Sequence, residues 1–190
     1  MPGLLVLGAS QLPGGGSKVY RGTYRRSPEY QAQFGPDHEV NRAFSQFCEL
    51  GGQSLVLSDI VFARRLVGLY RDLIPPQEFD LIEAVAVGEA PQFSDDLLGY
   101  EISKCGVGCS MLCWGLELTR YSSGADSIVV PLIRLMEESF KPRLNGSGLF
   151  DDPQVAQSCL ECMLAIHRVA PSYFESDLDA YEVSGLYLVR

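Results

Sequence analysis

The chain of 190 residues contains little histidine and has a shortage of cations. It holds two histidines, His38 and His167, and its 15 Lys and Arg stand against 24 Asp and Glu, for a net charge of −9. So few histidines leave little material for His-dependent nucleophilic catalysis or for a His-rich metal site. The shortage of cations argues against a dedicated nucleic-acid binder and against docking on anionic membranes, because both need a basic surface.

Long hydrophobic runs are also missing. No apolar run approaches the roughly 18–20 residues that span a bilayer, and the N-terminus lacks the charged start and longer apolar stretch of a signal peptide. We therefore expect a cytoplasmic protein with reduced thiols. Its six cysteines are Cys48, Cys105, Cys109, Cys113, Cys159 and Cys162.

The catalytic and metal-binding motifs in the sequence are incomplete. The glycines before Lys18 fail as a phosphate loop because Ser17 precedes the lysine instead of following it. Cys159 and Cys162 have the spacing of a zinc pair, with His167 nearby, but a second pair is missing and both cysteines lie on an apolar helical stripe. We predict no catalytic residue, no metal site and no cofactor.

Four segments have the apolar periodicity of helices. They begin at Asp37, after Ser58, near Ser127 and at the Asp152-Pro153 pair, which is typical of a helix start. The predicted buried face of the third segment consists of Leu132, Leu135, Met136 and Phe140. The predicted buried face of the fourth consists of Val155, Cys159, Cys162, Met163 and Ile166.

Strand patterns complete the fold prediction. Residues 79–87 form a nearly continuous apolar run, which favours a strand covered on both faces, whereas residues 98–102 and 181–189 alternate. Residues 19–24 fit a short strand or an arm lying over the domain. We predict an α+β fold with a small, mostly antiparallel sheet and about four packed helices. Residues 1–36 are expected to form an N-terminal arm or loop segment, and residues 37–190 a single domain.

The negative charge is unevenly distributed. Residues 1–30 carry four cations against Glu29, a net +3, which leaves −12 for the other 160 residues. Residues 75–103 contain seven acids and no Lys or Arg, and residues 144–182 contain seven acids against Arg168. Such a surface attracts a basic protein partner and accelerates association with it. The predicted partner-binding residues are Asp95, Asp96, Tyr100, Glu101, Tyr173, Phe174, Glu175, Asp177 and Asp179.

Three short stretches carry a resemblance to known proteins: residues 97–103 (LLGYEIS), 144–150 (LN…GLF) and 181–187 (YEVSGLY). In this order they resemble a loose group of small acidic bacterial single-domain proteins of the toxin-immunity type. The resemblance covers roughly residues 78–190, and its motifs are expected to mark strands and a turn. It implies an immunity protein that covers the basic active-site cleft of a secreted antibacterial toxin domain.

The leading hypothesis is therefore a non-enzymatic protein-binding module, most specifically an immunity protein with a basic protein partner. A first alternative is a thiol- or metal-dependent enzyme that uses Cys105, beside Lys104, or the Cys159, Cys162 and His167 cluster. A second alternative is a structural subunit of a homo-oligomer, in which the basic segment 18–26 docks on the acidic face of a neighbouring copy.

Overall fold

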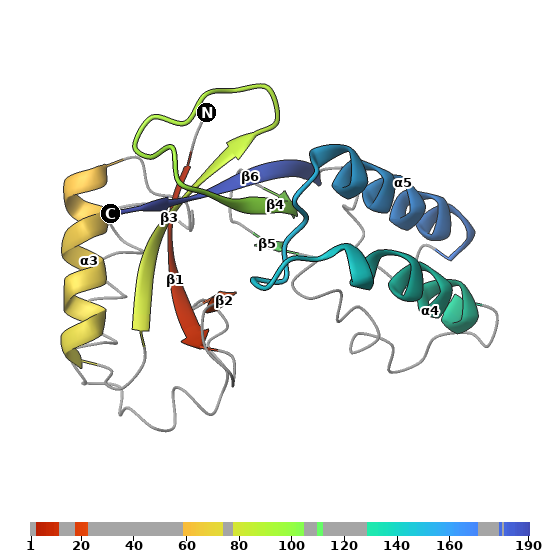
Figure 1. Ribbon diagram of the computed structural model, residues 1–190, viewed down its shortest axis with the longest axis horizontal. Helices are drawn as coiled ribbons and strands as arrows, with labels where there is room; N and C mark the ends of the chain where they lie inside the picture. Colours follow the sequence, from red (N-terminus) through yellow and green to blue (C-terminus); the bar gives the residue numbers. More distant parts are fainter. Residues whose placement is uncertain are drawn as a thin grey trace.

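The computed structural model of the chain describes residues 3–11, 18–22, 59–73, 78–104, 110–111, 129–170, 179 and 181–190. These residues form a six-stranded sheet with α-helices on either side of it (Figure 1). The fold is α+β, as predicted. The described part of the chain contains three α-helices, and the helix predicted from Asp37 lies outside the described residues. None of the described helices is both long and apolar enough to cross a membrane.

The sheet has the strand order β2-β1-β3-β6-β4-β5, and all the strand pairs described are antiparallel. The strands are β1 (Gly3–Gln11), β2 (Lys18–Gly22), β3 (Glu78–Ala86), β4 (Leu97–Lys104), β5 (Ser110–Met111) and β6 (Glu182–Val189). Because β6 pairs antiparallel with both β3 and β4, those two strands run parallel to each other. Their connection, residues 87–96, must therefore return along β6 from its start to its end.

The N-terminal strands revise one expectation. Residues 3–11 and 18–22 were predicted within an arm or loop segment, with a short strand as an option near Val19. Instead β1 pairs with β3, and β2 pairs with β1, so both belong to the central sheet. The apolar residues 4–7 provide the physical reason, since Leu4 is buried opposite Glu83 of β3.

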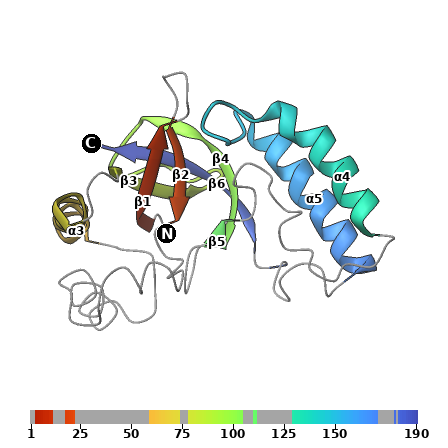
Figure 2. The same ribbon diagram turned by 90° about the horizontal axis from the view of Figure 1, so that it is seen from below.

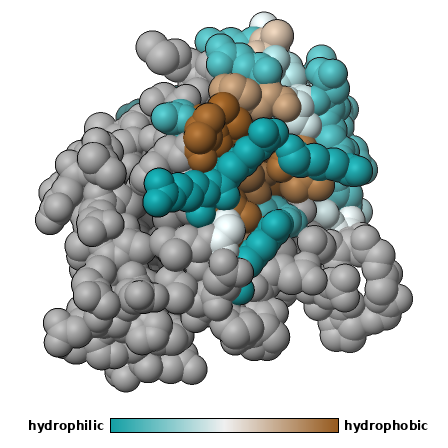
Figure 3. Space-filling model, turned by 90° about the vertical axis from the view of Figure 1, so that its left-hand side faces the viewer, coloured by the Kyte–Doolittle hydropathy of each residue, from teal (hydrophilic) through white to brown (hydrophobic). Residues whose placement is uncertain are grey.

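Helix α3 (Ile60–Leu73) contacts β1 and β3. Its N-cap is Asp59, whose carboxylate accepts a hydrogen bond from the Val61 N–H at 2.8 Å. Arg71 donates to the Phe79 carbonyl at 2.7 Å and pairs with Asp80 at 3.3 Å. Figure 3, seen from the side of α3, shows hydrophilic side chains projecting over hydrophobic ones.

Helices α4 (Val129–Phe140) and α5 (Pro153–Val169) lie side by side on the side of the sheet away from α3 (Figure 2). Asp152 caps α5 by accepting from the Gln154 N–H at 2.8 Å, and Pro153 opens the helix, as predicted. The core between these helices, β4 and β6 contains the following buried residues: Ile102, Val129, Ile133, Met136, Phe140, Phe150, Ala156, Cys159, Leu160, Met163, Ile166, Tyr181 and Val183.

Two predicted core faces are partly wrong. In α4, Met136 and Phe140 are buried as expected, but the helix turns Ile133 inward, and Leu132 and Leu135 are exposed. In α5, Cys159, Met163 and Ile166 are buried as expected, whereas Cys162 is exposed. In both helices, packing against the neighbouring elements decides which face is buried, and the number of apolar residues on a face does not.

The turn formed by residues 144–150 follows the short 3₁₀ helix Lys141–Arg143 and packs against β4. The backbones of Tyr100 and Phe150 exchange two hydrogen bonds, with N–O distances of 2.7 and 3.0 Å. The three stretches that carry the resemblance thus lie together, as strand β4, this turn and strand β6 with Tyr181 before it. They mark strands and a turn, as expected.

Candidate functional site

The connection between β3 and β4, here called the crossover loop (residues 87–96), passes over one face of the sheet. Glu83 of β3 binds the backbone in the middle of this loop. Its carboxylate accepts hydrogen bonds from the Gln92 N–H at 2.7 Å and the Phe93 N–H at 2.9 Å. Glu83 is 0% exposed. A buried carboxylate with two such donors is stabilised by charge-assisted hydrogen bonds, so it anchors the loop backbone.

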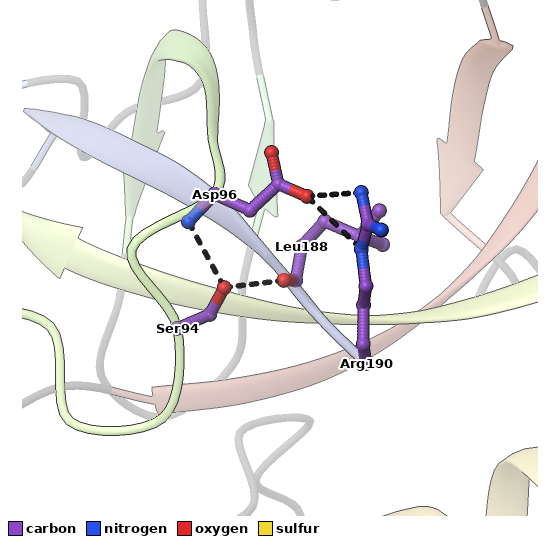
Figure 4. A network of polar contacts seen from close by, with 4 residues as sticks. All are labelled: Ser94, Asp96, Leu188 and Arg190. Carbon is purple, nitrogen blue, oxygen red and sulfur yellow. Dashed lines mark hydrogen bonds and ion pairs between the residues drawn. The ribbon is translucent and has the colours of Figure 1, made fainter.

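The end of the crossover loop is tied to the end of β6 by the network in Figure 4. The Ser94 hydroxyl donates to the Leu188 carbonyl and accepts from the Asp96 N–H at 3.0 Å. The Leu188 N–H donates to the Asp96 carbonyl at 2.8 Å. Arg190 completes the network through two nitrogens bonded to one Asp96 oxygen, at 2.7 and 3.2 Å.

The side chains at the tip and ends of the crossover loop remain in solvent although its backbone is held. Val87 is 53% exposed, Phe93 is 37% exposed and Leu97, the first residue after the loop, is 41% exposed. The acidic residues Glu89 and Asp95 are exposed beside them. The loop therefore presents apolar and acidic side chains together on a backbone that is hydrogen-bonded in place.

Two tyrosines lie on the same sheet face as Glu83. Tyr187 of β6 is directly opposite Glu83, and Tyr100 of β4 is directly opposite Gly185. The Tyr187 ring covers Gly185, where an added Cβ would lie 3.0 Å from a ring carbon. Because directly paired and alternate residues share a face, the ring of Tyr187 leans toward the position of Tyr100.

The environment of Tyr187 is both desolvated and negative. Burial raises the pKa of its phenol above the usual value of 10.0, and the nearby Tyr100, Glu83 and Asp95 raise this pKa further. Each of these causes disfavours the phenolate. Tyr187 and Tyr100 are both half-buried, so their rings are partly accessible. The surface made by Tyr100, Tyr187 and the crossover loop is the candidate site.

The structure separates the predicted partner-binding residues into groups. Asp95 is exposed on the crossover loop, Asp96 is half-buried against Arg190, and Tyr100 is half-buried in the candidate site. Glu101 is 0% exposed and does not belong to any surface. Its carboxylate accepts from the Ile102 N–H at 2.9 Å, and it lies opposite Ser184 on the other face of the sheet.

The second predicted group is only partly described. Tyr173, Phe174, Glu175 and Asp177 lie outside the described residues. Asp179 is exposed and precedes the start of β6, whereas Asp95 and Asp96 lie beside the end of that strand. The described members of the predicted set therefore lie toward opposite ends of β6. In residues 75–103, burial of Glu83 and Glu101 and the pairing of Asp96 with Arg190 reduce the charge available to a partner.

The thiol cluster offers poor chemistry for catalysis. Cys159 is buried and Cys162 is exposed, and both are free thiols. Partial burial of the otherwise exposed Cys162, and then the nearby Cys159 and Glu161, raise the pKa of its thiol above 9.0, which disfavours the nucleophilic thiolate. Among the described residues, no group of three His, Cys, Asp or Glu is placed to hold a metal ion. Cys105 lies outside the described residues.

Sequence reasoning missed several residues that build the candidate site. Glu83 is one of two acids, with Asp80, inside the apolar run 79–87, and an acid in a run expected to be buried is the signal that it has a specific hydrogen-bonding role. Ser94, Tyr187 and Arg190 gave no such signal, because their roles come from contacts between β6 and a loop about 90 residues earlier in the chain. Comparison of the chain with protein-family models, with curated proteins and with solved structures found no match.

Proposed function

We propose that this protein is a non-enzymatic protein-binding module whose crossover loop docks on a basic protein partner. The observation that carries the proposal is the combination of a fixed loop backbone with exposed apolar and acidic side chains. Partner binding usually costs free energy to order the loops that form the interface. A loop already held by Glu83, Ser94 and Asp96 avoids much of that cost.

The side chains on the loop suit such an interface. Phe93 supplies an aromatic group of the kind that contributes strongly to binding once it is buried by a partner. Asp95 and Glu89 beside it favour a positively charged surface and accelerate its approach. The overall charge of −9 also favours the approach of a positively charged partner.

Within this class, we propose an immunity protein that acts in the cytoplasm and covers the basic active-site cleft of a secreted antibacterial toxin domain. This narrower proposal is supported by the resemblance of residues 97–103, 144–150 and 181–187 and by the acidic, apolar surface of the crossover loop. The residues that carry the resemblance form the scaffold, whereas the loop that precedes β4 supplies the contact surface.

The test is a binding measurement with the basic toxin domain encoded beside the gene of this protein. We expect a one-to-one complex whose association slows with added salt, together with protection of cells that produce the toxin domain. The change Phe93→Ala should weaken the complex about tenfold or more. Leu135→Ala removes a comparably apolar, exposed side chain from α4 and serves as the matched control.

Two results would contradict the proposal. One is a complex whose affinity is unchanged by Phe93→Ala and by Asp95→Lys while both variants remain folded. The other is the lack of any basic toxin domain beside the gene together with the lack of a stoichiometric basic partner in cell extracts. The enzyme and homo-oligomer alternatives stay predictions, and no described contact favours either of them.

A further inference from the structure

The strip of sheet surface between the crossover loop and the turn of residues 144–150 contains the two half-buried tyrosines. Tyr187 leans over Gly185, and Tyr100 stands opposite Gly185 on the neighbouring strand. A side chain at position 185 would fill this space, since its Cβ would lie 3.0 Å from the Tyr187 ring. The glycine thus lets one tyrosine ring lie beside the position of the other on a single sheet face.

Carboxylates surround this tyrosine pair on the loop side. Glu83 lies directly opposite Tyr187 and stays below the loop, where backbone donors hold it. Asp95 is exposed on the loop above. Arg190, which follows β6, is already bonded to Asp96. Partly desolvated aromatic rings beside carboxylates attract a cation, because ring quadrupole and negative charge act together.

We infer that Tyr100 and Tyr187, with Asp95, form a subsite for one cationic side chain of the partner, an arginine guanidinium. The planar guanidinium stacks on aromatic rings and also bonds to a carboxylate in plane, which a lysine ammonium does not do equally well. This inference rests on the proposed function, for which it names the chemistry of one contact. It adds a second contact to the one made by Phe93.

The experiment uses the full chain and N-acetyl-arginine amide as the probe, followed by NMR shifts of the backbone amides. We expect saturable shifts centred on Tyr100, Gly185 and Tyr187, and a weaker response to N-acetyl-lysine amide. The citrulline analogue has nearly the same shape but no charge, and it should give no saturable shift. Tyr187→Leu should lower the affinity for the arginine probe about fivefold, whereas Tyr187→Phe should keep it within about twofold.

Matched variants keep this test independent of folding. Dispersed NMR spectra establish that each variant is folded, and Tyr20→Leu changes a tyrosine of β2, which β1 and β3 separate from β6 in the sheet. Equal shifts from the arginine and citrulline probes, or an unchanged affinity in Tyr187→Leu, would overturn the subsite.

The proposed function and this inference fail in different ways. If Phe93→Ala weakens the toxin-domain complex but Tyr187→Leu leaves both probe and complex binding unchanged, the subsite is wrong and the proposed function stands. If the arginine probe binds as expected but the affinity of the toxin-domain complex is unchanged by Phe93→Ala and by Asp95→Lys, the subsite stands and the proposed function is wrong.

Discussion

Two connections flank strand β4, and they treat their apolar residues in opposite ways. The turn of residues 144–150 buries its apolar side chains, with Leu149 and Phe150 almost completely removed from solvent. The crossover loop of residues 87–96 keeps Val87 and Phe93 exposed although its backbone is also held by hydrogen bonds. The fold itself explains the first connection, because its apolar residues stabilise the core. The second has apolar surface that the described fold does not use.

The polar groups of the two connections follow the same division. Asn145 organises the turn, since its side chain donates to the Leu98 carbonyl and to Asp151, both at 2.9 Å. Its side-chain oxygen accepts from the Ser147 and Leu149 N–H groups. The crossover loop is held through the carboxylates of Glu83 and Asp96 and the Ser94 hydroxyl, while the side chains of Val87 and Phe93 stay exposed. The difference suggests that one connection maintains the structure and the other presents a surface.

The largest expected contrast is between the two phenylalanines. Phe150→Ala should lower the free energy of unfolding by about 3–5 kcal/mol, because Phe150 is fully buried and packs edge-on against Phe140 at 6.3 Å. Phe93→Ala should change it by at most about 0.5 kcal/mol, because that ring lies at the surface. Urea unfolding of both variants measures the difference. An equal loss of unfolding free energy in the two variants would show that Phe93 has a structural role and would weaken its assignment to binding.

The next contrast uses two glycines with positive φ. Gly99, in β4 against the turn, has φ +144°, and an added Cβ would lie 2.8 Å from the Leu149 Cβ and 2.9 Å from the Phe150 carbonyl oxygen. Gly99→Ala should therefore cost about 1–3 kcal/mol from overpacking, in addition to backbone strain. Gly88→Ala, at φ +95° in the crossover loop, meets no atom within 4 Å and should cost about 1–2 kcal/mol from strain alone. Thermal unfolding that ranks Gly88→Ala as the more damaging change would contradict this account of the turn.

A smaller contrast compares the polar anchors of the two connections. Asn145→Ala removes four side-chain hydrogen bonds and leaves part-buried backbone groups without them, so we expect a loss of about 1–3 kcal/mol. Asp96→Ala removes an ion pair in which Arg190 is largely exposed, and we expect a loss of about 0–1 kcal/mol. Denaturant titrations in low and high salt distinguish the two variants, because only the loss of stability in Asp96→Ala should shrink as salt is added. A strongly salt-dependent Asn145 effect would not fit contacts that Asn145 makes mainly with backbone groups.

The smallest effect concerns the pH dependence of stability near the candidate site. The pKa of Tyr187 is raised above 10.0 in the folded protein, mainly by burial and then by Tyr100, Glu83 and Asp95. The folded state therefore holds the phenol proton more tightly than the unfolded state does. The resulting stability is fully present below pH 10 and is lost as the pH rises through the raised folded value.

Tyr187→Phe removes this contribution, so its stability should fall less steeply than that of the unmodified protein above pH 10. Unfolding midpoints measured across that range, with Tyr20→Phe in β2 as the control, test the prediction. Parallel curves for Tyr187→Phe and the unmodified protein would mean that Tyr187 titrates normally and would remove the electrostatic support for the tyrosine subsite.

Several elements could be predicted because their signals are local. The apolar run 79–87 became strand β3, whose residues 79–85 are buried throughout, and Asp152-Pro153 begins α5 as capping chemistry requires. Asp95, Asp96 and Tyr100 were named from acid density and aromatic content and lie in or beside the crossover loop, and their role in binding stays a prediction. Glu101 belonged to the same pattern but is buried, since alternation along β4 turns it to the opposite face from Tyr100.

The sequence by itself determined the α+β class, most element positions and the excess of negative charge, because each depends on neighbouring residues or on composition. Only the tertiary structure decided that β6 lies between β3 and β4, which forces the crossover loop across the sheet beside Tyr187. It also decided that Ile133 and not Leu135 faces the core. The physical reason is the same in both cases: pairing and burial depend on partners far away in the chain, and no local periodicity records which partner a strand or helix face will meet.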